Sequence, residues 1–141
     1  KTYHHRVNMP EIITPIQIRF SDIDWMGHVN NAVYLSYIEK ARIDFSERLP
    51  LNINWRETGF ILAQTQINYR HPALLNDNIS VRTWCTRVGT KSFDLGFEVF
   101  KTTDNNKIIL ADGLTVLVCY NYRLSVSENL PKEWKKLLLK K

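Results

Sequence analysis

The sequence is poor in cysteine and has no long apolar run. Only two cysteines, Cys85 and Cys119, occur among 141 residues. Both lie in apolar segments that we expect to be buried, so a secreted disulfide scaffold is not favoured. No segment approaches the roughly 20 consecutive apolar residues of a membrane-spanning helix. The N-terminal residues Lys1 to His5 also lack the apolar core of a signal peptide. We therefore expect a cytoplasmic protein with buried thiols.

Charge of one sign is limited as well. Charged residues make up 23% of the chain and the net charge is +5, which excludes an acidic disordered chain and falls short of a dedicated polycation. Aromatic residues do not interleave with the basic ones, so nucleic-acid binding is weakly supported. The chain has the length of one ordinary domain and shows no repeat or linker. We expect a single domain over residues 1–141, with a modest preference for anionic ligands.

Alternating apolar and polar positions predict five strands. The strands are expected near residues 16–20, 61–69, 79–85, 93–99 and 108–120. Turns at 88–90 and 103–106 predict two hairpins among them. The last strand is apolar at nearly every position, so we expect it to be covered on both faces, with a bulge at Gly113.

One segment follows a helical period instead. From Asn30 to about Leu49, apolar residues recur at intervals of three and four, which predicts a helix with one apolar stripe. We expect Asn30 or Asn31 to be its N-cap and Pro50 to mark its end. Glu39 and Arg42 have the i, i+3 spacing of a surface ion pair. After residue 130 we expect a short basic helix that caps the domain. The class is α+β, an antiparallel sheet curled around one long helix.

The densest group of polar residues lies between the first strand and this helix. It comprises Asp22, Asp24, His28, Asn30 and Asn31, with Gly27 among them. The amides at a helix start favour a developing negative oxygen, and glycine lets the backbone approach a ligand closely. The carboxylates could equally serve only as caps and turn acceptors. Spacing alone leaves both interpretations open.

The same segment carries a long motif. It reads Asp22-Ile23-Asp24-Trp25-Met26-Gly27-His28-Val29-Asn30-Asn31, and Tyr34, Glu39 and Ala41-Arg42 follow it on the helix. This pattern closely resembles the signature of the hotdog-fold acyl-CoA thioesterases of the 4-hydroxybenzoyl-CoA thioesterase type. Lys91-Ser92-Phe93 is a further similar feature. The resemblance implies a hotdog fold, in which a five-stranded antiparallel sheet wraps one long central helix.

The resemblance also implies the roles of the motif residues. Asp24 takes the place of the catalytic carboxylate, as base or nucleophile, with Asp22 in support. The amide near Asn31 would stabilise the oxyanion. Gly27, His28 and Asn30 would shape the loop or position the substrate. Other hotdog thioesterases carry their acid on the helix, which keeps Glu39 as a minor candidate.

Further expectations concern the substrate and assembly. The family implies coenzyme A on the surface near cationic turns, often from a neighbouring subunit, and the candidates here are Arg87, Lys91, Ser92 and Arg123. A homodimer or homotetramer is implied as well. We expect Tyr34, Tyr37 and Ile38 to be core. Phe60, Leu62 and Trp25 line the pocket or the core. His4, His5 and His71 are not spaced as metal ligands, so we expect neither metal nor cofactor.

Three rival interpretations remain at this stage. An acyl carrier protein could replace coenzyme A as the acyl donor. A non-catalytic acyl-CoA binding protein would fit the positive charge, although the intact acid motif argues against it. An enoyl-thioester hydratase also uses an acid and a histidine, but its pair follows the central helix, whereas Asp24 and His28 precede it.

Overall fold

The computed structural model describes residues 10–140. The prediction about Lys1 to His5 therefore lies outside the described residues. The elements in chain order are β1 (Glu11–Ile16), the 3-10 turn η1 (Phe20–Asp22), α1 (Val33–Arg48), β2 (Thr58–Tyr69), β3 (Ile79–Val88), β4 (Ser92–Thr103), β5 (Asn106–Asn121), β6 (Val126–Ser127) and α2 (Lys132–Leu138).

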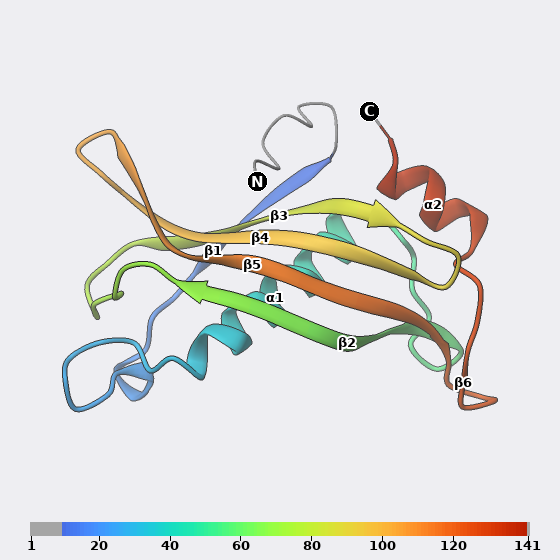
Figure 1. Ribbon diagram of the computed structural model, residues 1–141, viewed down its shortest axis with the longest axis horizontal. Helices are drawn as coiled ribbons and strands as arrows, with labels where there is room; N and C mark the ends of the chain where they lie inside the picture. The colour runs from blue at the N-terminus through green and yellow to red at the C-terminus, as the bar shows by residue number, and fades with distance from the viewer. Residues whose placement is uncertain (1–9, 141) are drawn as a thin grey trace.

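The strands form one antiparallel sheet with the order β1-β3-β4-β5-β2, and the two-residue β6 extends it beside the end of β5. Figure 1 shows β2 to β5 running side by side across the molecule, with α1 crossing them. The α+β class, the two hairpins and the five main strands are confirmed. The order also leaves β1 and β2 at the two edges of the sheet.

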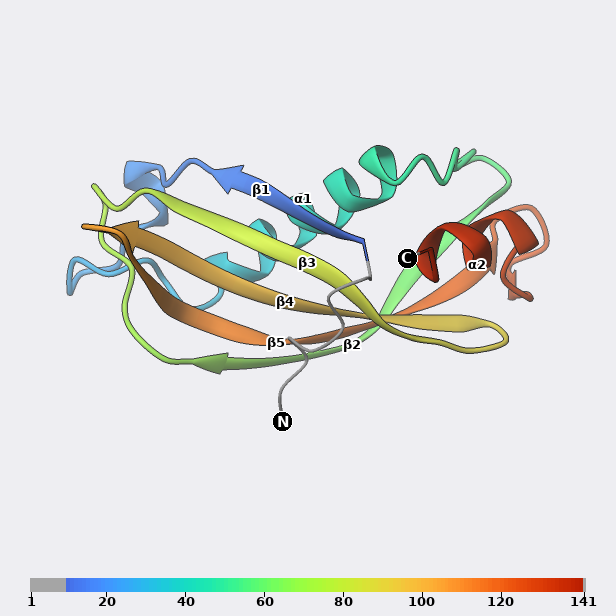
Figure 2. The same cartoon turned by 90° about the horizontal axis from the view of Figure 1, so that it is seen from above.

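The core lies between α1 and one face of the sheet, and Figure 2 shows α1 on that side of the sheet. One apolar cluster surrounds the first half of the helix and includes Tyr34 and Ile38, and a second surrounds Phe45. Trp134 and Leu138 of α2 belong to the second cluster, so the C-terminal helix caps the domain as expected. Cys85 and Cys119 are buried thiols, and burial together with the charge of Glu128 raises the pKa of Cys119 to about 11.

The first strand lies earlier in the chain than predicted. β1 ends at Ile16, which pairs with Ile79, and the chain then leaves the sheet. Phe20 belongs to η1 and is 82% exposed. The reason is a local turn, in which the Asp22 N–H donates to the Arg19 carbonyl at 2.9 Å. The strand predicted over 16–20 from the alternation of apolar residues is therefore wrong.

The start of α1 also differs from the prediction. Ala32 occupies the N-cap and makes no side-chain cap hydrogen bond. Asn30 lies two residues earlier, where its Oδ1 accepts the Ala32 N–H at 2.9 Å and its carbonyl accepts the Val33 N–H at 2.9 Å. Neither Asn30 nor Asn31 is therefore the N-cap, although Asn30 satisfies two amides at this helix start.

Arg42 points inward on α1 and does not form the predicted surface pair. Its side chain is buried, whereas Glu39 is exposed. No ion pair joins the two residues in the part of the chain that the structure describes. Burial lowers the pKa of Arg42, and the charge of Glu39 only partly opposes this effect.

The long strand β5 is regular at Gly113. The register between β4 and β5 shifts at Val99/Phe100, opposite Leu110, so the predicted bulge at Gly113 is wrong. Glycine is required there for a different reason, because a Cβ would collide with the carbonyl of Gln66 on β2. One face of β5 is buried and the other only half-buried, so the prediction of cover on both faces is also wrong.

Among residues 10–140, no helix is long and apolar enough to cross a membrane.

Candidate active site

The segment between η1 and α1 folds as a compact turn. The Asp24 N–H donates to the His28 carbonyl at 2.7 Å, and the Gly27 N–H donates to the Asp24 carbonyl at 3.1 Å. Gly27 has φ +85, and nothing lies within 4 Å of a Cβ built on it. The left-handed backbone is therefore one reason for a glycine at this position, and close approach of the backbone to a ligand stays a prediction.

The two oxygens of the Asp24 carboxylate have different surroundings. Oδ1 accepts the Met26 N–H at 2.9 Å and the His28 N–H at 3.1 Å. Oδ2 accepts no hydrogen bond from any residue between 10 and 140. The side chain is half-buried. One oxygen thus fixes the carboxylate in the turn, and the other is available for chemistry.

Asp22 is held in a different way. It is only 4% exposed, and its Oδ2 accepts the Tyr37 hydroxyl at 2.7 Å and the Arg19 N–H at 3.0 Å. Burial alone would raise the pKa of Asp22. The Arg19 amide, the Tyr37 hydroxyl and the Arg19 charge together outweigh that effect and hold the pKa below its ordinary value. Burial and the bond to Asp22 in turn raise the pKa of Tyr37. Asp22 is a structural anchor, in keeping with a supporting role.

A pocket of about 290 Å³ reaches Asp24. Its walls come from the turn, from α1 and from the segment that follows β2, and comprise Asp24, Met26, His28, Val29, Asn31, Tyr34, Tyr69, Arg70, His71 and Pro72. The predicted residues Asp24, His28 and Asn31 are therefore brought together. Buried Tyr34 forms part of the floor, and burial raises the pKa of its hydroxyl, which keeps that hydroxyl neutral near neutral pH.

The Asn31 amide is the open donor at this pocket. The Asn30 N–H donates to the Asp22 carbonyl, and the Ala32 and Val33 N–H groups both donate to Asn30. The Asn31 N–H has no acceptor among the described residues. A helix start that leaves one amide unpaired beside a carboxylate is suited to an oxyanion.

Sequence reasoning missed three residues of the pocket wall, Tyr69, Arg70 and His71. The Tyr69 hydroxyl donates to the Asn31 carbonyl at 2.9 Å. Arg70 forms an ion pair with Asp112 on β5 at 3.1 Å. The polar run at the end of β2, just before Pro72, was a signal in the sequence, but nothing in it indicated contact with a turn some 40 positions earlier.

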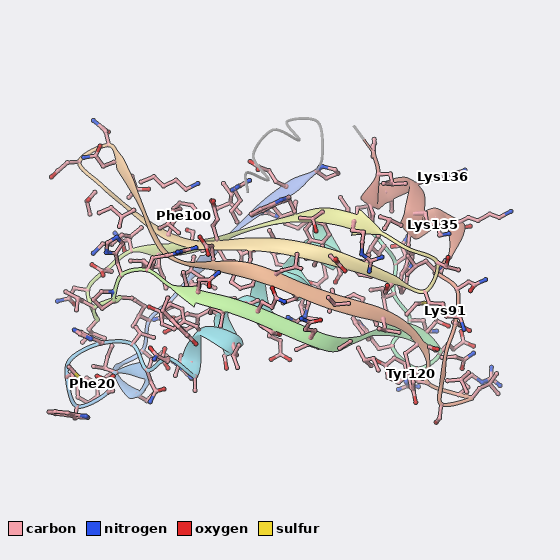
Figure 3. The ribbon with its side chains drawn as sticks, viewed as in Figure 1. Phe20, Lys91, Phe100, Tyr120, Lys135 and Lys136 are labelled. Carbon is pink, nitrogen blue, oxygen red and sulfur yellow. The ribbon has the colours of Figure 1, made fainter. Side chains whose placement is uncertain are left out.

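The predicted coenzyme A contacts lie at the end of the sheet that is opposite to the Asp24 pocket. Figure 3 shows Lys91 at the opposite end of the sheet from Phe20, which begins the turn before Asp24. Arg87 and Ser92 flank Lys91, and Arg87 is held by Asp94 at 2.9 Å and by the Ser92 hydroxyl at 2.8 Å. The hydrogen bonds that Arg87 donates to the Asp94 carboxylate raise the pKa of Arg87. Within one chain, this cationic turn does not meet the pocket.

The other candidates are also placed by the structure. Arg123 pairs with Glu57 at 3.1 Å, and both side chains are exposed. Glu39 lies on a separate groove between β1 and α1 and does not line the Asp24 pocket. Tyr37, Ile38 and Phe60 are core, whereas Leu62 and Trp25 are exposed. In the described part of the chain, no three acidic, histidine or cysteine side chains form a group that could hold a metal ion, and His4 and His5 lie outside it.

Comparisons with known proteins place the chain in a family. A family model described as the thioesterase-like superfamily matches residues 18–138. Long-chain acyl-CoA thioesterase FadM of Escherichia coli (strain K12) is 31% identical over 113 residues, which cover 78% of this chain and 83% of that protein. The chloroplastic acyl-acyl carrier protein thioesterase ATL3 of Arabidopsis thaliana is 27% identical over 113 residues, covering 77% of this chain and 58% of that protein.

Among solved structures, a mutant 4-hydroxybenzoyl CoA thioesterase complexed with 4-hydroxybenzoyl CoA is similar, with a TM-score of 0.84. The match covers 91% of this chain and 98% of that one, at 17% identity, which supports the fold alone. The predicted hotdog fold and thioesterase class are thus confirmed, and the chain belongs to the thioesterase-like superfamily.

Proposed function

We propose that this protein hydrolyses an acyl-CoA thioester to the free acid and coenzyme A. The observation that carries the proposal is the shared pocket, which is lined both by Asp24, whose Oδ2 accepts no hydrogen bond from the described residues, and by Asn31, whose N–H has no acceptor among them. A carboxylate and an oxyanion donor are the groups that acyl transfer to water requires. The identity to a long-chain acyl-CoA thioesterase supports the choice of substrate.

The reaction needs little beyond these two groups. Water adds its oxygen to the acyl carbon, the C–S bond breaks, and the thiol leaves with a proton. By analogy with cysteine, the leaving thiol has a pKa of about 8.5, so its departure needs little acid assistance. One oxyanion donor such as the Asn31 amide is typically worth about 10²–10³ in rate. We therefore propose that neither metal nor cofactor takes part.

Asp24 has two chemically distinct routes. As a base, it takes a proton from the attacking water. As a nucleophile, Oδ2 attacks the acyl carbon and forms a mixed anhydride that water then cleaves. A single turnover in ¹⁸O-labelled water tests the second route. Label in the Asp24 side chain establishes a mixed anhydride that water cleaves at the aspartyl carbon, because the first route puts label only in the product acid.

The direct test is thiol release from a panel of short, long and aromatic acyl-CoAs, with Asp24→Asn beside the parent. Asparagine keeps the Oδ1 acceptor for the Met26 and His28 amides, so the turn is retained. We expect kcat to fall at least about a hundredfold with no change in thermal unfolding. Equal turnover in the two proteins would remove Asp24 from the reaction. A parent that retains coenzyme A but cleaves no thioester would be a binding protein.

An acyl carrier protein is the second candidate donor, because a relative of this chain is an acyl-acyl carrier protein thioesterase. The thioester chemistry is the same for both donors, so the pocket does not separate them. Adding acyl carrier protein thioesters to the panel does. A kcat/KM for the carrier-bound acyl group that exceeds the coenzyme A value would change the assigned substrate and leave the role of Asp24 intact.

We further propose that the active form is a cytoplasmic homodimer or an assembly of such dimers, joined through the edge of β2. This 12-residue strand has one unpaired edge, and Ile61, Leu62 and Tyr69 on it are exposed. A long apolar edge strand is a template for pairing with a second chain. A two-fold axis would place the two β2 strands antiparallel.

Such pairing would bring the far end of one subunit toward the pocket end of the other. Lys91 and Arg123 would then reach the phosphates of a coenzyme A whose thioester lies at the partner's Asp24. In this arrangement, residues that lie at opposite ends of the sheet within one subunit contact one substrate molecule across the dimer.

Subunit complementation tests the composite site. Asp24→Asn chains are mixed by co-expression with chains that carry Lys91→Ala and Arg123→Ala together. If the sites are shared, each heterodimer holds one native site, and a random mixture regains about a quarter of parental activity. If each site lies within one chain, the mixture shows only the mean of the two variants, and the shared site is wrong.

A further inference from the structure

We propose that the Tyr69 hydroxyl is a positioning residue for the oxyanion amide of Asn31. This inference rests on the proposed function. The Tyr69 side chain contributes no reacting group and instead holds the backbone that carries the Asn31 N–H. Tyr69 lies at the end of β2, some 40 positions from the turn it contacts.

The geometry joins a rigid donor on the sheet to the turn that carries Asn31. The Tyr69 hydroxyl donates to the Asn31 carbonyl at 2.9 Å. Tyr69 pairs in the sheet with Ala111 of β5, and its ring packs edge-on against Tyr34, with ring centroids 5.3 Å apart and planes at 84°. Tyr34 itself is buried in the first turn of α1. The phenol is therefore fixed by both the sheet and the helix.

The other restraints on Asn31 come from its own turn and from the start of α1. It is exposed and precedes the helix, so it lacks the hydrogen bonds of α1. The backbone amides of Asn30 and Ala32 on either side are tied to the Asp22 carbonyl and the Asn30 side chain. The bond from Tyr69 is the one hydrogen bond of Asn31 itself within residues 10–140. The Asn31 N–H shares a peptide plane with the Asn30 carbonyl, which accepts the Val33 N–H, so the turn itself sets the direction of this N–H. The Tyr69 bond ties the turn to β2 and so fixes where the N–H lies relative to the sheet side of the pocket.

A role in orientation makes a specific kinetic prediction. An oxyanion donor acts where negative charge develops, so its misalignment weakens the transition state more than the bound substrate. Tyr69 should therefore affect kcat and leave KM nearly unchanged. Since Tyr69 exchanges no proton in the reaction, the pH dependence of kcat/KM should keep its shape.

The test is Tyr69→Phe in the full-length protein, assayed by thiol release on the best acyl-CoA of the panel. The matched control is Tyr122→Phe, because the Tyr122 hydroxyl donates to the Phe60 carbonyl at 3.2 Å, away from the pocket. For Tyr69→Phe we expect kcat to fall about three- to tenfold, the range that corresponds to one neutral hydrogen bond, with KM within about twofold of the parent. Tyr122→Phe should keep the parental kcat.

The outcomes separate this proposal from its alternatives. A kcat of Tyr69→Phe equal to that of the parent overturns it. So does an effect confined to KM, which would place Tyr69 in substrate binding, and so does an equal loss in Tyr122→Phe, which would indicate a general effect of instability. A changed pH profile would assign Tyr69 to proton transfer and also overturn it. If the parent itself releases no thiol, the proposed function fails first.

Discussion

The segment that joins β1 to α1 has two halves with opposite character. In the first half, Asp22 is buried and both its backbone and its side chain are hydrogen-bonded. In the second half, Asp24 is half-buried, and only one of its two carboxylate oxygens accepts hydrogen bonds from described residues, from amides of its own turn. Two aspartates two positions apart thus have different surroundings, and we expect these surroundings to give them different tasks.

The comparison shows how the fold separates stability from reactivity. Tyr37 reaches Asp22 from α1, so this carboxylate connects the turn to the helix. No described residue outside the turn hydrogen-bonds to the Asp24 side chain. Replacing the first acid should therefore weaken the fold, and replacing the second should stop the reaction. Three measurements sharpen or break this division.

The largest expected effect on stability is that of Asp22→Asn. This variant keeps the shape but loses the charge that the Tyr37 hydroxyl, the Arg19 amide and the Arg19 guanidinium stabilise. We expect the free energy of unfolding to fall by about 2–3 kcal/mol, as for loss of charge-assisted hydrogen bonds. Urea denaturation measures it, and turnover at a temperature where the variant is folded should stay within about fivefold of the parent. If Asp22→Asn has the parental stability but no turnover, Asp22 would be the residue needed for the reaction, contrary to the roles assigned here to Asp22 and Asp24.

Low pH should destabilise the fold through the same residue, Asp22. Because the folded pKa of Asp22 lies below its ordinary value, ionised Asp22 stabilises the fold at neutral pH. That contribution is complete above the unfolded pKa and is lost as the pH falls through the folded pKa. Glu98 behaves alike, since the hydrogen bonds and charges of Arg82 and Lys107 outweigh burial and lower its pKa. The unfolding free energy should drop below about pH 4, and less steeply in Asp22→Asn. Equal slopes for parent and variant would show that Asp22 is not the anchor.

The smallest of the three effects is that of Gly27→Ala. An alanine at φ +85 costs about 1 kcal/mol in backbone strain, and no neighbouring atom adds a clash. The unfolding free energy should fall by that amount, and kcat should fall severalfold because the strain is placed in the turn that holds Asp24. Differential scanning calorimetry and thiol release measure the two effects. A Gly27→Ala variant with the parental kcat would show that Asp24 remains active in a distorted turn.

Periodicity predicted much of the fold, because local pattern and tertiary packing agree there. The hairpins at Gly89 and at Asp104-Asn105 and the apolar stripe of α1 are cases of this kind. It failed at Phe20, where hydrogen bonds between Arg19 and Asp22 override an alternating pattern. It also failed at Arg42, which is buried although its spacing from Glu39 suggests a surface pair.

The candidate site was predicted only where its residues are contiguous in sequence. Asp24, His28 and Asn31 meet because one turn holds them. Tyr69, Arg70 and His71 join them only through the pairing of β2 with β5 and the placement of α1, and spacing in a single sequence does not encode such contacts. The separation of Arg87 and Lys91 from the pocket likewise depends on strand length and direction.

The way in which Asp24 is fastened has an evolutionary consequence. Among residues 10–140, every hydrogen bond to its carboxylate comes from a residue within four positions along the chain. Substitutions on distant strands that reshape the rest of the cavity therefore leave these hydrogen bonds intact. In the proposed reaction, the acyl group that is accepted can then change through the cavity walls while the carboxylate stays in place.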